Sequence, residues 1–497
     1  MCGRTEGEIL DTDLILAVDV GSSSVRAALY TSSGERLDDT ECSLSYSLDV
    51  DRDGAATKDA EELFRLFTSA IDRTLKLAGQ RGGISAVAVS TFWHAVLGVD
   101  SEGKPTTPVL TWADRRSARC ADELRERLNA ETLHQRTGCV PHSSYLPAKL
   151  LWLSRQAPEA FGRTAHWLSP GEYFYLRIFG ETSVGVSMAS ATGLMHQNEK
   201  AWDSETLEAL PVDESSLSTI SDAPRTGLKP EWEKRWPTLS GASWMPAAGD
   251  GACSNVGVGS TTGDQAALMV GTSGAMRVLW KAESVGIPPG LWCYRPDGKR
   301  FVMGGALSDG GNLIAWLQNT LRLPPLKETE AEISSREPGS HGLNFLPLLA
   351  GERGPQWSDL ANGAITGLSM ATTPTDILHA AMEAVALRFA LISRKIEHSL
   401  PPTGERRIIA TGGGLSASPA WTRMMADALG RPLTSSKVEE ASSRGATLLA
   451  AESLGGPPVE EASVPLGETV EPDERRHEAY MEALDRQSIL YDTLIDK

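Results

Sequence analysis

The chain carries near its start the stretch LILAVDVGSSSVRAALY (residues 14–30), in which two apolar runs flank a short polar turn. The first run, Leu14 to Val18, ends in Asp19, and the second extends from Val25 to Tyr30. The turn consists of one glycine and three serines. This arrangement predicts a β-hairpin that presents an acid and small hydroxyl residues at its tip.

A similar order of segments returns past the middle of the chain. An apolar run at 265–270 leads into the turn GTSG (271–274), and a second run follows at 275–280. Further on, a strand predicted at 407–410 ends in TGGG (411–414). The two halves share this pattern of strand, small-residue turn and strand, although their identity is too low for a sequence repeat.

Helical periodicity separates the predicted strands. Apolar residues recur at helical spacing from Lys58 to Leu75 and from Asp376 to Ile396, and a short buried strand is predicted at 84–90. Further helices are expected near 418–429 and 472–494. The alternation predicts an α/β fold. We place a domain boundary near 245–260, which divides the chain into 13–255 and 256–497.

Composition narrows the class of function. The chain has 497 residues, enough for two or three domains, and a net charge of −18. This acidity argues against nucleic acid and anionic membranes as partners. No apolar stretch of about 18 residues predicts a membrane span. Six scattered cysteines without CxxC spacing and a polar segment from Met1 to Asp13, unlike a signal peptide, favour a reduced cytoplasmic setting.

The small-residue turns are candidate phosphate sites. Glycine and serine let backbone N–H groups approach an anion without a Cβ in the way. One such turn is a weak signal, because ordinary hairpins have them too, but one turn in each half is stronger. Asp19 ends a buried strand beside the first turn, where a carboxylate suits a magnesium ion.

Other nucleotide motifs have less support. The chain contains no G-x-x-x-x-G-K-[ST] segment, which argues against a P-loop enzyme. Gly412-x-Gly414-x-x-Ala417 after a strand matches a loose dinucleotide-binding fingerprint, so a nicotinamide or flavin protein stays an alternative. Such a unit usually opens a domain, however, and little chain follows this one. HExxH and G-x-S-x-G are also missing.

Six segments resemble, in the same order, motifs of the FGGY carbohydrate kinases. They are residues 16–26, 111–116, 249–252, 271–274, 351–355 and 409–414. The first, fourth and sixth are similar to the two phosphate motifs and the adenosine motif of the actin/Hsp70/sugar-kinase superfamily. The resemblance covers about residues 13–455. Arg26 stands where the usual pattern has lysine.

The resemblance implies two ribonuclease-H-like domains with an active-site cleft between them, and ATP and Mg²⁺ as cofactors. Domain closure would bring the γ-phosphate to a sugar hydroxyl and exclude water. Asp19 would hold the metal. The residues that the resemblance assigns to ATP are Gly21, Ser22, Ser23, Ser24, Arg26, Gly271, Thr272, Ser273, Gly311, Gly412, Gly413 and Gly414.

Asp250 is the catalytic candidate. The family uses an aspartate at the matching position as a general base toward the attacking hydroxyl. A sugar alcohol is a weak nucleophile, so a carboxylate that accepts its proton aids phosphoryl transfer. Asp264 is the nearest competitor and is expected to be a loop residue before a strand.

The substrate is expected to be a small sugar or sugar acid. The positions that the resemblance assigns to it are Trp93, His94, Trp112, Asp114, His142 and Arg353. Core packing is the alternative role for Trp93 and Trp112, and Lys149 is expected to be structural. His94 and Arg353 are the candidate partners for a substrate carboxylate.

Details of three segments resemble the gluconate kinases of the family. These are GTSGAMR (271–277), GGALSDGG (304–311) and Pro141-His142. They favour phosphorylation of D-gluconate to 6-phosphogluconate. Phe92-Trp93 and Ser308-Asp309 depart from the pattern near the sugar position, so xylulose, ribulose or another polyol stays open. A non-catalytic ATP-binding sensor or switch is the alternative outside the enzymes, and a homodimer is also left open.

Overall fold

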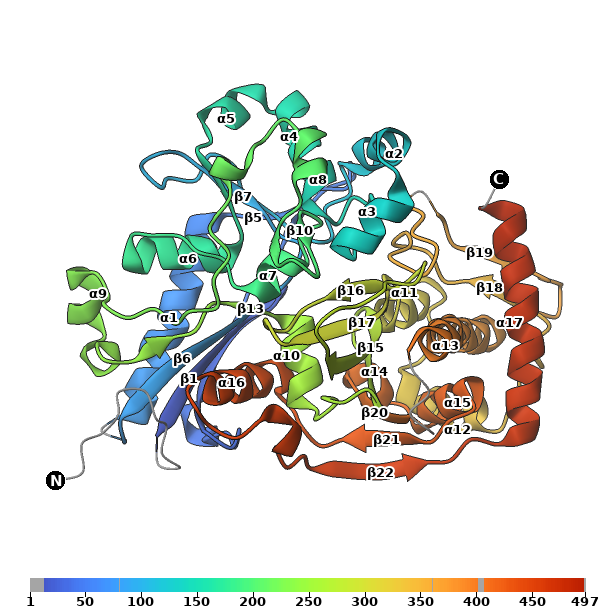
Figure 1. The fold of residues 1–497 in the computed structure, drawn as a ribbon. Helices are drawn as coiled ribbons and strands as arrows, with labels where there is room; N and C mark the ends of the chain where they lie inside the picture. Colours follow the sequence, from blue (N-terminus) through green and yellow to red (C-terminus); the bar gives the residue numbers. More distant parts are fainter. Residues whose placement is uncertain (1–12, 80, 360, 401–405, 496–497) are drawn as a thin grey trace.

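The computed structural model describes residues 13–79, 81–359, 361–400 and 406–495, and Figure 1 shows their arrangement. Cys2 and the polar segment before Asp13, which is predicted not to be a signal peptide, lie outside these residues. Two mixed sheets, one in each half of the chain, form the centre of the molecule, and helices pack around them. The predicted α/β class is confirmed.

The first sheet has the strand order β12-β6-β1-β2-β3, and β13 also pairs with β6. β1 is antiparallel to β2 and parallel to β6. The predicted hairpin is therefore confirmed, and Asp19 on β1 lies opposite Arg26 on β2. The strands are β1 (Leu14–Val20), β2 (Ser24–Thr31), β3 (Cys42–Ser45), β6 (Ile84–Thr91), β12 (Ser243–Trp244) and β13 (Ala248–Gly249).

The second sheet has the order β16-β17-β15-β14-β20-β21-β22. β14 is antiparallel to β15 and parallel to β20, as β1 is to β2 and β6. The predicted pattern shared by the halves is thus a shared topology. The strands are β14 (Gln265–Val270), β15 (Gly274–Lys281), β16 (Trp292–Tyr294), β17 (Arg300–Leu307), β20 (Arg407–Thr411), β21 (Leu433–Ser436) and β22 (Leu466–Val470).

Short strand pairs and helices complete the described chain. The remaining strands are β4 (Asp49–Val50), β5 (Ala56–Lys58), β7 (Leu97–Val99), β8 (Val109–Leu110), β9 (His166–Leu168), β10 (Met195–His196), β11 (Ala201–Trp202), β18 (Asn344–Leu346) and β19 (Ala364–Thr366). The helices of the first half are α1 (Ala60–Ala78), α2 (Ala118–Arg127), α3 (Ala130–Thr137), α4 (Leu146–Gln156), α5 (Pro158–Arg163), α6 (Pro170–Phe179), α7 (Val186–Ser190), α8 (Ser204–Glu208) and α9 (Pro230–Arg235). Those that follow are α10 (Asp250–Gly257), α11 (Gly311–Thr320), α12 (Leu326–Ser334), α13 (Pro374–Ser399), α14 (Gly413–Ser416), α15 (Pro419–Leu429), α16 (Ala441–Ser453) and α17 (Glu474–Leu494).

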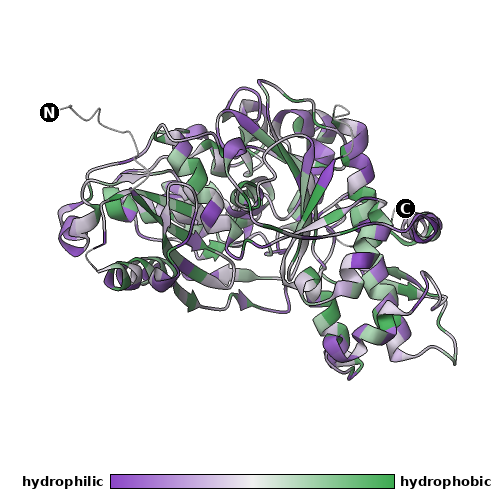
Figure 2. Cartoon of the chain, turned by 90° about the horizontal axis from the view of Figure 1, so that it is seen from below, coloured by the Kyte–Doolittle hydropathy of each residue, from purple (hydrophilic) through white to green (hydrophobic). Residues whose placement is uncertain are grey.

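Hydrophobic burial holds each half together. α1 illustrates how: Asp59 caps its first turn by accepting the N–H of Glu62, and its apolar residues at helical spacing are buried. The two largest clusters of buried apolar side chains lie mainly in the two separate halves. Figure 2 shows green, hydrophobic segments in the interior and purple, hydrophilic ones distributed over the outer helices and loops. None of the helices in the described ranges has the length and apolar character needed to span a membrane.

Two helices cross in close contact where the halves meet. α10 packs against α16, which also lies on β1 and β6 of the first sheet although it comes late in the chain (Figure 1). The crossing depends on glycine. A Cβ at Gly445 would lie 2.5 Å from the carbonyl carbon of Cys253, and one at Gly257 would lie 2.7 Å from that of Ala441. The predicted division between 255 and 256 falls inside α10 and stays a prediction.

Candidate active site

A cavity of about 590 Å³ is lined by residues of both halves of the chain. It brings together side chains that lie far apart in the sequence, from the turn of the first hairpin to the segment after residue 350. Ten of the predicted site residues line it: Ser22, Ser23, Trp93, His94, Trp112, His142, Asp250, Thr272, Ser273 and Arg353.

Asp250 is the first residue of α10 and faces this cavity between two glycines. Trp93 lies across that backbone. A Cβ at Gly249 would overlap its indole nitrogen, and one at Gly251 would lie 2.5 Å from its ring. The indole N–H of Trp93 donates to the carbonyl of Ser187 at 3.1 Å. Trp93 therefore both packs in the core and lines the cavity, and the flanking glycines let it lie against the Asp250 turn.

The charge of Asp250 is set by its surroundings. Burial raises the pKa of its carboxyl above the ordinary range, and the nearby guanidinium of Arg277 lowers that pKa in part. One carboxylate oxygen also accepts the N–H of Gly251 at 2.7 Å. Asp264, the competing acid, accepts from the hydroxyl of Thr262 in the loop before β14 and does not line the cavity. Its predicted position in a loop is confirmed.

A smaller cavity of about 210 Å³ adjoins Asp250 and contains Asp19 and Arg26. Arg26 lies 3.2 Å from one oxygen of Asp19 and 2.6 Å from Glu440. The other oxygen, Oδ1, is buried and has no hydrogen-bond partner among residues 13–79, 81–359, 361–400 and 406–495, and burial raises the pKa of Asp19 to about 6. An unpartnered carboxylate oxygen in a polar cavity is a suitable ligand for a hydrated divalent cation.

The turn at 271–274 is held by the start of α11. The N–H of Gly311 donates to the carbonyl of Gly271 at 2.8 Å, and the N–H of Asn312 donates to that of Thr272 at 3.0 Å. A Cβ at Gly311 would lie 2.7 Å from the same Gly271 oxygen. Gly311 therefore supports the turn from behind, while the side chains of Thr272 and Ser273 face the cavity.

The three glycines after β20 differ in their surroundings. Gly412 has a φ of +98°, and a Cβ there would lie 2.7 Å from the carbonyl carbon of Val270. A Cβ at Gly414 would lie 2.9 Å from the Val270 oxygen, whereas one at Gly413 would meet no atom of the described residues within 4 Å. Packing on β14 thus explains Gly412 and Gly414, and with them the loose dinucleotide fingerprint, but it leaves Gly413 unexplained.

The two histidines of the cavity are electrically neutral. Burial lowers the pKa of His94 well below its usual value, and Nδ1 of that ring donates to the carbonyl of Ala191 at 2.6 Å. Nε2 of His94 is then an acceptor toward the cavity. His142 uses both nitrogens: Nδ1 accepts the N–H of Ser144, and Nε2 lies 3.0 Å from the carbonyl of Glu352. The suggested role of His94 as a cation for a carboxylate has no support.

Two further predicted residues have different positions. The guanidinium of Arg353 lies over the ring of Trp112, 4.4 Å from its centre, and both residues line the cavity. Asp114 does not line it. Its carboxylate accepts from the guanidinium of Arg116 at 2.6 Å and from the N–H of Ala56 at 3.2 Å. Asp114 therefore fixes the loop behind the cavity wall.

Lys149 has the predicted structural role. Its buried ammonium donates at 2.5–2.7 Å to the carbonyls of His94, Thr111 and Ser144, which belong to three segments of the cavity wall. Burial lowers the pKa of Lys149 to about 7. The three bonds hold these segments in position.

Several residues that line the cavity are not identified by any sequence motif. Trp292 and Tyr294 of β16 stack at 4.5 Å, and Tyr294 meets Trp93 edge to face at 5.1 Å. The hydroxyls of Tyr294 and Tyr145 are hydrogen-bonded at 2.6 Å. In the sequence, Arg277 stands out only as the last residue of the GTSGAMR segment. Its period-two spacing from Ala275 in a buried strand was a usable signal, because a charged residue on a buried strand face needs a partner.

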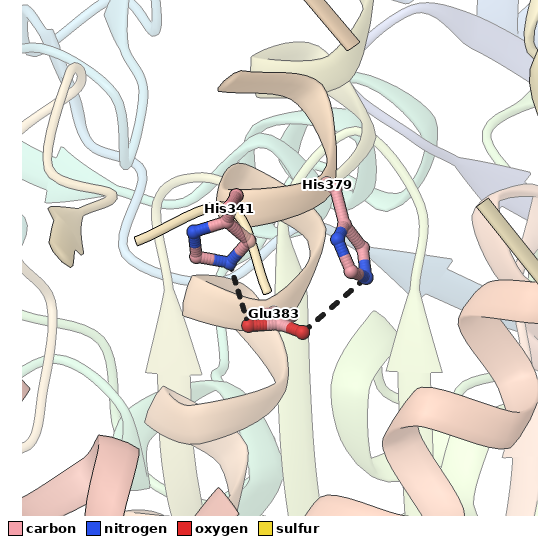
Figure 3. Close-up of side chains that lie close together, drawn as sticks. All are labelled: His341, His379 and Glu383. Carbon is pink, nitrogen blue, oxygen red and sulfur yellow. Dashed lines mark hydrogen bonds and ion pairs between the residues drawn. The ribbon is translucent and has the colours of Figure 1, made fainter. Parts of the chain in front are cut away.

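A cluster of titratable residues also lies outside the cavity (Figure 3). His341 and His379 both face the carboxylate of Glu383, at 2.9 and 3.3 Å. The N–H of Leu343 donates to Nδ1 of His341, so the proton of that neutral ring lies on Nε2 and points at Glu383. Because Nε2 then has no lone pair for a metal ion, this arrangement favours a structural link between α13 and the preceding loop.

This cluster predicts a pH dependence of stability. Burial lowers the pKa of His379 to about 4, whereas an unfolded histidine titrates near 6.5. The unfolded chain therefore takes up the proton first, and stability that is present above pH 6.5 is lost as the pH falls toward 4, by up to about 3 kcal/mol. We expect a shallower acid dependence in His379→Gln, measured by chemical denaturation between pH 7 and 4.5. His398→Gln, at the exposed end of the same helix, is the control and should retain the full dependence; equal slopes in all three proteins would contradict the assignment.

Similarity to known proteins extends over most of the chain. The N-terminal domain model of the FGGY family of carbohydrate kinases matches residues 14–257, and the C-terminal domain model matches 266–454. A gluconokinase of Bacillus subtilis is 28% identical over 459 residues, which cover 88% of this chain and 87% of that protein. Gluconate kinase from Lactobacillus acidophilus has a similar structure, with a TM-score of 0.88, 26% identity and coverage of 97% and 98% of the two chains. The structure of ligand-bound xylulose kinase from the same organism is also similar, with a TM-score of 0.87 and 25% identity, and the match covers 97% of this chain and 98% of that one.

Proposed function

The chain belongs to the FGGY family of carbohydrate kinases, and we propose that it phosphorylates D-gluconate to 6-phosphogluconate. It is an ATP-dependent phosphotransferase with the two-domain, actin/Hsp70-like fold of the sugar kinases. The similarity to a gluconokinase and to a gluconate kinase of known structure supports gluconate as the substrate.

The observation that carries the proposal is the position of Asp250 in one cavity with the hydroxyl-bearing turn at 271–274 and the Trp93 ring. In the proposed reaction the sugar hydroxyl attacks the γ-phosphorus of ATP. The bond to the bridging oxygen of ADP breaks, and the hydroxyl proton passes to a carboxylate oxygen of Asp250. The aromatic walls would shield this step from water.

The phosphates of ATP would lie against the two small-residue turns. Ser22, Ser23, Thr272 and Ser273 line the cavity, and their hydroxyls and backbone N–H groups are suitable donors to phosphate oxygens. The unpartnered oxygen of Asp19 is the best candidate ligand for Mg²⁺. When bound, Mg²⁺ would neutralise part of the charge on the phosphates.

A substrate panel tests the proposal. Purified protein with Mg-ATP is offered D-gluconate, D-xylulose, D-ribulose and glycerol, and ADP release is followed by a coupled assay. We expect the highest kcat/KM with gluconate. Xylulose is the second candidate because of the similarity to a xylulose kinase. A preference for it would change the proposed substrate but leave the proposed phosphoryl transfer in place. If no sugar raised turnover above the ATPase background, an ATP-binding switch would be favoured.

Gly413 offers a specific test of the nucleotide site. Because a Cβ there meets no protein atom within 4 Å, we expect Gly413→Ala to fold with normal stability. If the adenosine lies over this turn, the added methyl group should raise the KM for ATP about tenfold and leave the KM for the sugar unchanged. Gly241→Ala, also at an open position but in the turn before β12 rather than in the turn after β20, is the control. An unchanged KM for ATP would place the nucleotide elsewhere.

A further inference from the structure

Arg277 is a buried cation whose side chain has too few partners. It extends from β15, is 7% exposed and lines both cavities. Its Nε and Nη1 are buried and have no hydrogen-bond partner among the described residues. A guanidinium in such a position costs folding free energy unless a ligand pairs with it. Burial accordingly lowers the pKa of Arg277 to about 10, which still leaves it charged at neutral pH.

The charges around the main cavity do not balance. In the described part of the chain its lining contains three guanidinium groups and three carboxylates, which belong to Arg115, Arg277, Arg353, Asp250, Glu352 and Asp359. Glu352 is already paired with Arg388, which lies behind the wall, and with the hydroxyl of Tyr491. One positive charge is therefore left over, and both histidines are neutral.

Of the three arginines that line the cavity, Arg277 and Arg353 are available to a ligand. The third, Arg115, donates from its guanidinium to the backbone carbonyl of Asp359. Arg353 stacks on Trp112 and has no ion pair with a carboxylate among the described residues. Arg353 lies close enough to Arg277 to lower the pKa of Arg277, an unfavourable proximity that an anion between or beside the two guanidinium groups would relieve.

The position of Arg277 favours the sugar over ATP as its partner. It lies three residues, roughly 10 Å of extended strand, beyond Gly274 at the end of the phosphate turn. The groups that act electrostatically on it are Asp250, Arg353 and Tyr294, all of which line the main cavity, and Asp19 is not among them.

We propose that Arg277, together with Arg353, binds the carboxylate of a sugar-acid substrate. The pair would provide a planar, charged recognition site for a carboxylate on the wall of the cavity. This inference rests on the proposed function, because it needs a substrate that carries a carboxylate. It makes Arg277 a residue that selects sugar acids over neutral polyols.

The test compares two ligands that differ only in the carboxylate. D-glucitol has the carbon chain and stereochemistry of D-gluconate with CH₂OH in place of the carboxylate. Binding of each is measured by calorimetry without ATP, followed by kcat and KM for each with Mg-ATP. We expect Arg277→Met to weaken gluconate binding roughly 10–100-fold and to leave glucitol binding unchanged. Arg277→Lys keeps the positive charge but loses the planar guanidinium that can form two parallel hydrogen bonds to a carboxylate, so its gluconate affinity should be intermediate.

A matched control separates recognition from folding. Arg300 is a buried arginine of the same sheet, but it is fully paired with Asp297, Glu452 and Glu460. We expect Arg300→Met to lower the unfolding temperature without changing the gluconate-to-glucitol ratio. Arg277→Met should change that ratio and lower the unfolding temperature less than Arg300→Met, because Arg300 loses three close ion pairs.

The other outcomes are distinguishable. If the wild-type protein phosphorylates a neutral sugar and neither binds nor uses gluconate, the substrate in the proposed function and this inference both fail. If it uses gluconate but Arg277→Met weakens both ligands equally, or raises only the KM for ATP, the proposed function stands and Arg277 does not recognise the carboxylate.

Discussion

Asp250→Asn is expected to lower kcat by at least about 10²-fold while leaving ATP and sugar binding close to normal. The amide has nearly the same shape as the carboxyl but cannot accept the hydroxyl proton as the bond to phosphorus forms. Folding should be retained, because burial already raises the pKa of the Asp250 carboxyl and so disfavours its charged form. Steady-state kinetics with the preferred sugar, together with calorimetric binding of ATP, measure the two effects separately.

Asp264→Asn is the matched control for this substitution. Asp264 is in the loop before β14, where it accepts a hydrogen bond from Thr262, and it does not line the cavity. Its replacement should change kcat less than about twofold. Near-normal turnover in Asp250→Asn would remove Asp250 from the role of general base.

Gly445→Ala is expected to have the largest effect on stability. The new methyl group would overlap the carbonyl oxygen of Cys253 and lie 2.5 Å from its carbon. That obstacle is backbone inside α10, so no side-chain rotation relieves it and the two helices must separate. Overpacking of this kind costs about 1–3 kcal/mol or more, against a gain of up to about 1 kcal/mol in helix propensity. We expect a fall in the unfolding temperature of roughly 5 °C.

The same substitution should also impair catalysis, because α10 begins with Asp250. A shift of that helix would move the carboxylate relative to the turn at 271–274, and displacements near 1 Å can cost about 10²-fold in rate. Gly162→Ala in α5 is the control, since a Cβ there meets nothing within 4 Å and alanine favours the helix. Normal stability and activity in Gly445→Ala would show that the helices do not cross this closely in solution.

Much of the fold follows from local patterns in the sequence. The hairpin at 14–30 and its counterpart at 265–280 were predicted from apolar runs around small-residue turns. The long helix α13 was predicted from its spacing of apolar residues. These signals are reliable because strand and helix periods are expressed in neighbouring residues. The close crossing of α10 and α16 was not predictable, since its two glycines lie almost 190 positions apart.

The candidate site, like the fold, is only partly predictable from the sequence. The sequence by itself determined that Asp250 lies among small residues and that two Gly/Ser/Thr turns stand at strand ends, because these are contiguous motifs. Only the tertiary structure decided which polar groups have bonding capacity left. In the folded chain Asp114 is hydrogen-bonded to Arg116, both ring nitrogens of His142 have hydrogen-bond partners, and burial keeps His94 neutral. The tertiary structure also leaves Nε and Nη1 of Arg277 without a hydrogen-bond partner in the part of the chain that the structure describes. Charge state and hydrogen-bond saturation depend on burial and on contacts between distant segments, and no local pattern encodes them.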